Sequence, residues 1–502
     1  MRTLSQLVRH GHHVCVRGCR ISFLMSDQST KTAEAEIPAP AWGDLFRDGR
    51  GIYTTLVILG VCLHALQILV IAIVMPTVVA DIGGADYYTW PAMLYTIGSI
   101  IGAACVGPLW AWLDVRRGYG VSALAFLVGT IGCALSPDML ILNISRGIQG
   151  VASGLVVGGG MALVSGLFAE NIRKKVLAAY QGTWMIAQLS GPFIGGLFAQ
   201  IGWWRGSFWS MVPIILVFAA IALRYLPEVL PNEDEKYKKA HIPLLRLLTL
   251  SAGVFCVALA GQNNEVRFIA PMIGGAAFLI WLAFMLDRRS ENKLYPTGAM
   301  SIFSPVGLAL WIMLLIGMVH TTVPLLIPLL LQVVHGVDPI YVGLVSLVIS
   351  GGWTVGTFAV SGWSGKKEIF ALWIGPLLIM AGLAGITVTA TQPLLAVLVF
   401  ASFVLGFGVG VQNVHIIART MSAAAKGEER VTSSAMPSVR SLGTAFGAAT
   451  AGLVTNLAGL GSATTAEEVG PAITASFSFG FLPLSIAVLM MFWLLRLTRK
   501  TQ

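Results

Sequence analysis

Charged residues are scarce in this chain. Asp, Glu, Lys and Arg make up only 11% of its 502 residues, whereas a soluble protein carries about 25%. Apolar residues account for 56% of the sequence instead. This composition excludes an ordinary water-soluble domain and predicts that most of the chain lies in a lipid bilayer.

Long apolar stretches occupy the sequence between the few charges. A membrane-spanning helix needs about 20 apolar residues, and the lack of water in the hydrocarbon layer forces such a stretch to be helical. We expect an all-α membrane protein with fourteen transmembrane helices, arranged as two six-helix bundles plus an inserted helix pair. The predicted helices are 53–76, 88–112, 119–136, 139–167, 176–201, 207–226, 243–261, 268–286, 303–332, 338–363, 369–388, 393–418, 432–456 and 472–495.

Basic residues are nearly absent from every second gap between these stretches. Those gaps contain only Arg205 and Arg267, whereas the alternate gaps contain most of the remaining Lys and Arg. The positive-inside rule then places both termini in the cytoplasm, and an even number of helices is consistent with this because it puts the two termini on the same side. The net charge of +9 is spread over many short loops, so it does not indicate a nucleic-acid partner. We expect a multi-pass protein of the bacterial inner (plasma) membrane.

Polar intervals are few, and they mark the expected boundaries. Two six-helix bundles indicate a transporter built from repeats, with the substrate site between the halves near the midplane. The predicted parts are a cytoplasmic tail at 1–50 (with Met25 as an alternative start), an N-terminal bundle at 51–226, a linker and inserted helix pair at 227–302, a C-terminal bundle at 303–495, and a cytoplasmic tail at 496–502.

Signals of bound cofactors are also missing. The sequence has no GxxxxGK[ST] loop to hold a nucleotide phosphate, which argues against direct use of ATP. Cys15 and Cys19 lie near several histidines, but no spacing typical of a tetrahedral metal site is repeated. We therefore expect no cofactor, no metal and no enzymatic activity.

Glycine-rich motifs on the predicted helices identify a family. The motifs are Arg146-Gly-Ile-Gln149-Gly150, Gly191-Pro192 with Gly195 and Gly196, Leu331-Gln332 through Asp338-Pro339, and Arg440-Ser-Leu-Gly443. Together they resemble the major facilitator superfamily, specifically its fourteen-span drug:proton antiporter branch, over roughly residues 50–495. The resemblance implies transport by alternating access. It also implies that the Gly191–Gly196 motif bends and seals its helix against the other half, although ordinary small-residue packing is the simpler alternative.

The resemblance also implies roles for several charged residues. The arginine that matches Arg146 is implicated in proton coupling, and an ionisable group inside a membrane span is costly and usually functional. A structural cation bonded to helix carbonyls is the alternative. Arg440 could act similarly or could snorkel toward the interface. Asp114, Arg116 and Arg117 form a degenerate copy of a gating motif, for which a solvated loop charge pair is the alternative.

One departure from the family bears on the substrate. The fourteen-span antiporters commonly have an aspartate nine residues before the proline matching Pro76, where this chain has Gln67. No Asp or Glu lies well inside a predicted span, and an unpaired cation buried there would be strongly penalised. We therefore expect a neutral or anionic substrate, such as an aromatic acid, rather than a cationic dye.

Other polar side chains could take over proton coupling or line the substrate site. A histidine titrates near physiological pH. His320 lies near mid-span, and His64 shares a helix face with Gln67. The alternative is that each histidine only satisfies a structural hydrogen bond. The candidate residues for coupling or substrate binding are Arg146, His320, Gln67, His64, Gln188, Gln332, Gln412, Asn413 and Arg440, with Trp184, Trp311 and Trp353 as candidate aromatic walls.

The favoured interpretation is a proton-coupled exporter of a small organic molecule. An organic-acid importer and a non-transporting receptor or scaffold are the alternatives. The expected partners are the lipid bilayer, a small-molecule substrate and protons, and we expect a monomer.

Overall fold

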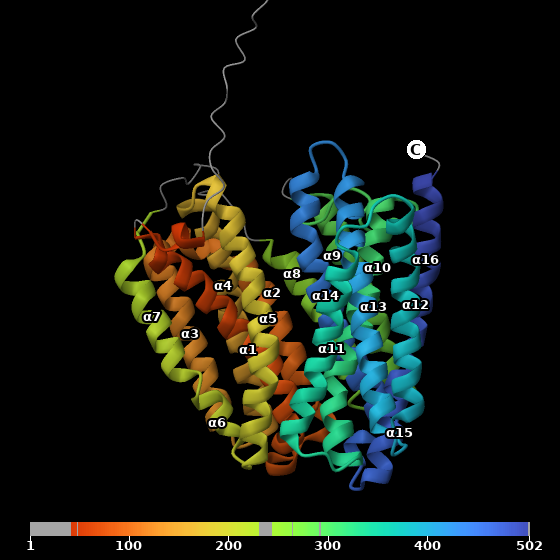
Figure 1. The fold of residues 1–502 in the computed structure, drawn as a ribbon. Helices are drawn as coiled ribbons and strands as arrows, with labels where there is room; N and C mark the ends of the chain where they lie inside the picture. The colour runs from red at the N-terminus through yellow and green to blue at the C-terminus, as the bar shows by residue number, and fades with distance from the viewer. Residues whose placement is uncertain (1–41, 48, 230–242, 264, 291–292, 500–502) are drawn as a thin grey trace, which may run out of the picture. The chain divides into compact units, whose positions relative to one another are not determined.

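The computed structural model describes residues 42–47, 49–229, 243–263, 265–290 and 293–499. Within these ranges the chain is helical and contains no strand (Figure 1), which confirms the prediction of an all-α protein. The expectations for Met25, Cys15 and Cys19 fall outside the described residues.

The first half of the chain contains seven α-helices, which we call the N half. It consists of η1 (Trp42–Leu45), α1 (Arg50–Ile82), η2 (Ala85–Tyr87), α2 (Trp90–Leu113), α3 (Val115–Leu135), α4 (Met139–Leu167), α5 (Glu170–Gln200), α6 (Trp204–Trp209) and α7 (Val212–Tyr225).

Two helices follow, and then a second set of seven, which we call the C half. The inserted pair is α8 (Leu244–Ala260) and α9 (Val266–Arg288). The C half consists of α10 (Pro305–Leu329), η4 (Leu330–Val334), α11 (Pro339–Val360), α12 (Lys366–Thr389), α13 (Leu395–Ser422), α14 (Glu429–Leu457), η5 (Leu460–Ser462), α15 (Ala466–Phe479) and α16 (Phe481–Arg499).

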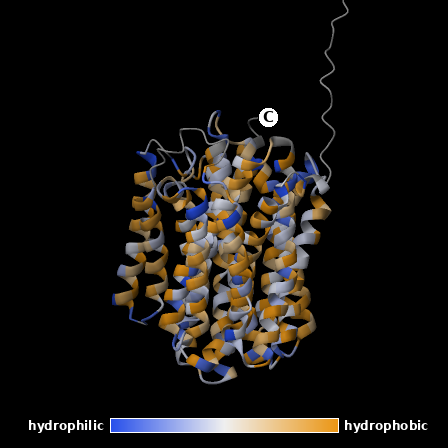
Figure 2. Ribbon diagram, turned by 90° about the vertical axis from the view of Figure 1, so that its left-hand side faces the viewer, coloured by the Kyte–Doolittle hydropathy of each residue, from blue (hydrophilic) through white to orange (hydrophobic). Residues whose placement is uncertain are grey.

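Eleven helical segments are long and apolar enough to cross a membrane. Among them, α6–α7 and α15–α16 each count as one span although the helix is interrupted. Helix α8 is apolar but shorter, while α5 and α14 are long helices that do not meet the same criterion. Hydrophobic residues run along most of the helices and hydrophilic ones gather toward their ends (Figure 2), as the bilayer requires.

The two halves repeat one packing scheme. In the N half, α1 packs on α5, α4 packs on both α2 and α3, and α3 packs on α7. In the C half the corresponding pairs are α10 with α14, α13 with α11 and α12, and α12 with α16. The halves stand side by side in Figure 1, red to yellow-green for one and green to blue for the other. Each half therefore has its own copy of a bundle.

Glycines bring helix backbones into direct contact at matching places in both halves. A Cβ on Gly154 of α4 would lie 2.0 Å from the carbonyl oxygen of Ser99 on α2. A Cβ on Gly410 of α13 would lie 2.1 Å from the carbonyl oxygen of Trp353 on α11. Real Cβ atoms do not approach this closely, so only glycine allows these helix pairs to pack as they do.

Contacts between the halves lie at one end of the molecule. We call the end with the α2–α3 turn and the end of α16 the basic end (top of Figure 1), and the end with η2 and η5 the opposite end. Toward the opposite end, Gln332 Nε2 donates to the Ile73 carbonyl at 3.0 Å, and Asn456 Nδ2 donates to the Asp86 carbonyl at 2.6 Å. Among the described residues, the hydrogen bonds that join the N half to the C half all lie toward the opposite end.

At the basic end, two ion pairs each join residues of the same half. There the Arg116–Glu228 pair (3.4 Å) stays within the N half, and the Arg419–Glu368 pair (3.0 Å) stays within the C half. The halves are thus joined at the opposite end and separately braced at the basic end.

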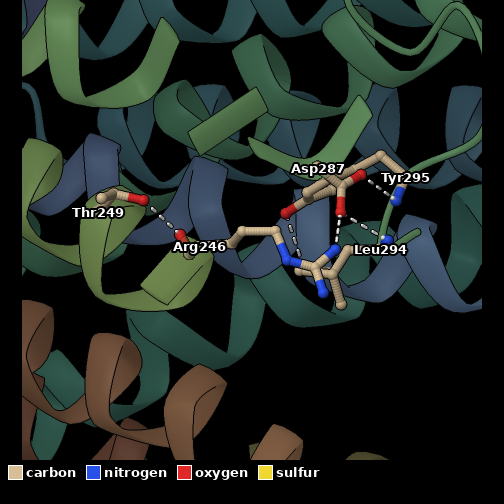
Figure 3. A network of polar contacts seen from close by, with 6 residues as sticks. Arg246, Thr249, Asp287, Leu294 and Tyr295 are labelled. Carbon is tan, nitrogen blue, oxygen red and sulfur yellow. Dashed lines mark hydrogen bonds and ion pairs between the residues drawn. The ribbon is translucent and has the colours of Figure 1, made fainter. Parts of the chain in front are cut away.

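The inserted pair is fixed to the bundle by a buried polar network near the basic end (Figure 3). Arg246 of α8 forms an ion pair with Asp287 of α9, and both side chains are almost fully buried. The Asp287 carboxylate also accepts hydrogen bonds from the backbone N–H groups of Leu294 (2.9 Å) and Tyr295 (3.1 Å). The Tyr295 hydroxyl lies 3.2 Å from Ser438 Oγ on α14. Beyond this network, α8 contacts both α14 and α2.

We expect Asp287→Ala to destabilise the protein by about 3–5 kcal/mol, because it breaks a buried ion pair and leaves two backbone N–H groups without their acceptor. The matched control is Glu265→Ala, which removes the exposed partner of Arg267 and should change stability by less than about 1 kcal/mol. Thermal unfolding of the detergent-solubilised variants measures both. Equal effects of the two substitutions would contradict a stabilising role for the network.

Candidate functional site

Arg146 of α4 is completely buried in the N half and is held by neutral acceptors. Its Nη1 donates to Gln149 Oε1 (2.5 Å) and to Gln67 Oε1 (3.5 Å). Its Nη2 donates to the Gln67 carbonyl (3.4 Å), and its Nε donates to the Pro91 carbonyl (3.2 Å). Gln67, in place of the family's aspartate, therefore contacts the arginine directly, and α1, α2 and α4 meet at its guanidinium.

A chain of hydroxyl and imidazole groups extends from the arginine. The Arg146 guanidinium lies over the Tyr95 ring, 4.1 Å from its centroid. The Tyr95 hydroxyl donates to Ser153 Oγ at 2.6 Å, and His64 Nδ1 lies 2.6 Å from the same Ser153 oxygen. The Trp184 ring of α5 lies edge-on to the His64 ring, with the two ring centroids 5.7 Å apart. We call these side chains, together with Gln67 and Gln149, the N cluster.

A second cluster occupies the C half. Arg440 of α14 donates through Nη2 to Asn413 Oδ1 of α13. Its guanidinium carbon lies 5.7 Å from the centroid of the Trp353 ring of α11. His320 of α10 meets Trp353 edge-on, with ring centroids 4.8 Å apart. We call these four residues the C cluster. Its helices α10, α11, α13 and α14 correspond to α1, α2, α4 and α5 of the N cluster.

The two clusters lie at similar depth on either side of the interface. Helices α5 and α11 contact each other where a Cβ on Gly343 would lie 2.6 Å from the Pro192 carbonyl. Trp184 lies eight residues before Pro192, and Trp353 lies ten residues after Gly343. At 1.5 Å per residue, both tryptophans are about 12–15 Å from this contact toward the basic end.

Acidic residues are absent from this level of the molecule. On the described helices, every Asp or Glu falls within the first or last turn, as Asp81, Asp287 and Glu368 do. Neither Arg146 nor Arg440 forms an ion pair with a described residue. Both clusters are therefore positively charged, and the part of the chain that the structure describes supplies no counter-charge to either.

Several predicted residues lie elsewhere in the structure. Gln332 belongs to the contact between the halves near the opposite end. Gln412 is buried against α12, where a Cβ on Gly375 would lie 2.7 Å from the Gln412 Cβ. Trp311 donates to the Met300 carbonyl within the C half. Gln188 is half-buried on α5, one turn after Trp184.

The Asp114 motif lies at the turn between α2 and α3. Asp114 has a left-handed backbone (φ 67°), and its carboxylate accepts from the Arg117 backbone N–H at 2.8 Å as the N-cap of α3. Arg116 donates through Nε to the Leu226 carbonyl at 2.6 Å and pairs with Glu228. In this conformation the motif fastens the α2–α3 turn to the end of α7, inside the N half.

The glycine–proline motif of α5 lies where α5 contacts both α1 and α11. A Cβ on Gly191 would lie 2.9 Å from Leu69 Cβ of α1, and a Cβ on Gly195 would lie 3.0 Å from Ile73 Cβ. A Cβ on Gly196 would lie 2.8 Å from the Pro339 carbonyl of α11. One helix face is thus packed on α1 while the adjacent face is packed on the other half.

Sequence reasoning missed several members of the N cluster. Tyr95 and Ser153 are buried. Thr130 is buried beside the cluster, where its Oγ1 accepts from Gln149 Nε2 at 2.9 Å. Ser153 lies seven residues after Arg146 on α4, two helical turns along the same face. That spacing is the signal that could have identified it.

Comparisons with known proteins agree with the fold and the motifs. A sequence profile described as the Major Facilitator Superfamily matches residues 57–448. A probable multidrug-efflux transporter of Mycobacterium tuberculosis (strain ATCC 25618 / H37Rv) is 29% identical over 452 residues, which cover 88% of this chain and 95% of that protein. A dehydrocurvularin exporter of Aspergillus terreus is 25% identical over 373 residues, covering 70% of this chain and 64% of the exporter.

A solved structure shows the same fold. A bacterial homolog of the human lysosomal transporter Spinster, in an inward-facing and unoccupied conformation, aligns with a TM-score of 0.60 at 15% sequence identity. The alignment covers 90% of this chain and 98% of that one.

Proposed function

This chain belongs to the major facilitator superfamily, and on that premise we propose that it is a proton-coupled exporter of a neutral or anionic small organic molecule. Membership makes it a multi-pass membrane transporter of small molecules rather than an enzyme. Its similarity to a probable multidrug-efflux transporter supports export. The proposed charge of the substrate rests on one observation: Arg146 and Arg440 form no ion pair with any described carboxylate.

The proposal includes the fourteen-span architecture and its orientation. We add α5, α8 and α14 to the eleven apolar segments, because each packs among them along its length. The basic end then faces the cytoplasm under the positive-inside rule. The hydrogen bonds that join the halves at the opposite end are those expected of a conformation closed on the side away from the cytoplasm. Alternating access would proceed by rocking of the two halves about the clusters.

For the proton we favour the N cluster over the C cluster. His64 lies in a hydrogen-bonded chain with Ser153 and Tyr95, and Tyr95 contacts Arg146. His320 contacts a tryptophan ring and makes no hydrogen bond among the described residues. Two short hydrogen bonds therefore connect His64 to Tyr95 through Ser153, and the Tyr95 ring contacts the Arg146 guanidinium. Protonation of His64 can change the electrostatic environment of Arg146 by this path. His320 has no such chain among the described residues.

Proton flux in liposomes tests the proposed function. The protein would be reconstituted with a trapped pH dye and offered cationic drugs, neutral antibiotics and aromatic acids. We expect substrate-triggered proton movement with the neutral or anionic compounds. Strong export of ethidium would contradict the proposed substrate charge. An absence of proton movement during transport of labelled compounds would contradict coupling to protons.

We expect His64→Gln to reduce substrate-driven proton movement at least about tenfold, since proton transfer by a positioned side chain contributes two to four orders of magnitude. The matched control is His335→Gln, because His335 directly follows η4 and the one side-chain hydrogen bond it makes among the described residues is to the Ala390 carbonyl. Proton flux measured as a function of pH compares the two. An unchanged pH profile in His64→Gln would remove His64 from the mechanism.

A further inference from the structure

The two intramembrane arginines differ in how many of their donors the protein uses. A guanidinium carries five N–H donors. Arg146 makes four hydrogen bonds to protein acceptors and is completely buried. Arg440 makes one hydrogen bond, to Asn413, and is only half-buried. Arg146 is therefore satisfied within its own half, whereas Arg440 has donors available to a ligand.

Arg440 does not reach the membrane surface. It lies eleven residues after Glu429, the first residue of α14, which places it about 16 Å along the helix from the basic end. Its guanidinium is held between Asn413 and Trp353 rather than extended toward the helix end. An arginine at this depth without a counter-charge has a strong electrostatic requirement for an anion.

The surroundings of Arg440 define the shape of that anion. Trp353 presents its ring beside the guanidinium, and His320 covers the ring edge-on from α10. An arginine fork recognises a planar carboxylate through two parallel hydrogen bonds. An indole stacks with a flat aromatic group in preference to a flexible chain.

We propose that the C cluster is the substrate site and that it binds an aromatic carboxylic acid, whose carboxylate pairs with Arg440 and whose ring packs on Trp353. Asn413 is a positioning residue, since its side chain holds Nη2 of the arginine. This proposal rests on the proposed function, which it extends by naming the substrate class and assigning it to the C half. Arg146 takes no part in ligand binding.

The neutral side chain of Asn413 leaves the charge of Arg440 available for an anionic ligand. An aspartate there would pair with Arg440 and compete with the substrate carboxylate for the same charge. The amide of Asn413 orients the guanidinium through its oxygen and leaves the positive charge uncompensated. Asn413→Asp therefore removes the site's preference for anions without removing the arginine.

Binding to the full chain in lipid nanodiscs tests the proposal independently of transport. The probes are 2-naphthoate, its neutral isostere 2-naphthamide, and the aliphatic anion octanoate, each measured by equilibrium dialysis against empty nanodiscs. We expect 2-naphthoate to bind at least about tenfold more tightly than either other probe, because one charge-assisted hydrogen bond corresponds to about a factor of ten.

Three substitutions and one control test which side chains contribute to the affinity for 2-naphthoate. Arg440→Gln and Asn413→Asp should each weaken 2-naphthoate binding by about 10- to 100-fold, and Trp353→Leu should remove the preference over octanoate. The matched control Arg224→Gln removes an exposed arginine near the end of α7 and should leave affinity within about twofold. Asn413→Asp remains informative if Arg440→Gln fails to fold.

The outcomes separate this proposal from the proposed function. Equal binding of 2-naphthoate and 2-naphthamide, or full affinity in Asn413→Asp, would overturn the aromatic-acid site. If 2-naphthoate binds in this pattern but drives no proton movement, the site stands and proton coupling fails. If neutral drugs drive proton movement while 2-naphthoate does not bind, the transporter assignment stands and the site fails.

Discussion

Substitution of Gly154 by alanine is expected to prevent stable folding. A Cβ at this position would lie 2.0 Å from the Ser99 carbonyl oxygen on α2 and 2.8 Å from the Ala103 backbone nitrogen. Both neighbours are backbone atoms, so no side chain can rotate away and the two helices must separate. Overpacking of a flexible core costs about 1–3 kcal/mol, and a rigid backbone contact should exceed that range.

The same helix provides the control. A Cβ on Gly147 meets nothing within 4 Å, so Gly147→Ala should be neutral or stabilising by up to about 1 kcal/mol. Size-exclusion profiles and thermal unfolding of the two detergent-solubilised variants measure the difference. A monodisperse Gly154→Ala protein with unchanged thermal stability would show that α2 and α4 are not packed backbone to backbone.

Replacement of Arg146 by glutamine is expected to abolish transport, with a loss of at least about 100-fold. The variant removes a cation and four hydrogen bonds, and it leaves acceptors on Gln67, Gln149 and Pro91 buried without their donor. Bonds to a charged donor contribute about 1.5–3 kcal/mol each, and 1.4 kcal/mol corresponds to a factor of ten.

Arg146→Lys separates charge from geometry. Lysine keeps the positive charge but cannot reach four acceptors on three helices with its single ammonium group. We expect it to fold and to retain a small fraction of substrate-driven proton flux. Near-normal flux in Arg146→Gln, measured in the same liposomes, would reduce Arg146 to a structural residue. Binding of 2-naphthoate should be preserved in both variants, because the C cluster does not include Arg146.

The helices could be predicted because the bilayer imposes a length and a composition on the segments that cross it. All fourteen predicted ranges fall on helices, and most boundaries agree within a few residues. The interruptions between α6 and α7 and between α15 and α16 were not predicted. Hydropathy gives no warning of either break, but Pro213 and Pro483 lie in the first turns of α7 and α16, and a proline at a helix start is the signal that could have located them. Pro324 and Pro328 lie inside α10 without ending it.

The site was only partly predictable, because burial and facing depend on neighbouring helices. Arg146 and Arg440 stand out as charges in apolar sequence. Gln412 and Asn413 are adjacent in the chain, yet one faces α12 and the other bonds to Arg440. Successive residues point about 100° apart around a helix, and a single sequence does not say which direction faces the other half. The donors used by each arginine are likewise visible only in three dimensions.

The inserted pair makes the interface between the halves less accessible from the lipid on one side than on the other. On one side, α8 touches both α2 and α14 and is backed by α9, so it covers the place where α2 and α14 of the two halves meet. On the other side, α5 and α11 meet each other directly, through a contact about 12–15 Å from the tryptophan level. With the orientation and substrate class proposed above, an amphipathic acid dissolved in the cytoplasmic leaflet would approach Arg440 past α5 and α11. The α8–α9 pair would block lateral entry on its own side, and the substrate would reach the site from the lipid phase on the α5–α11 side.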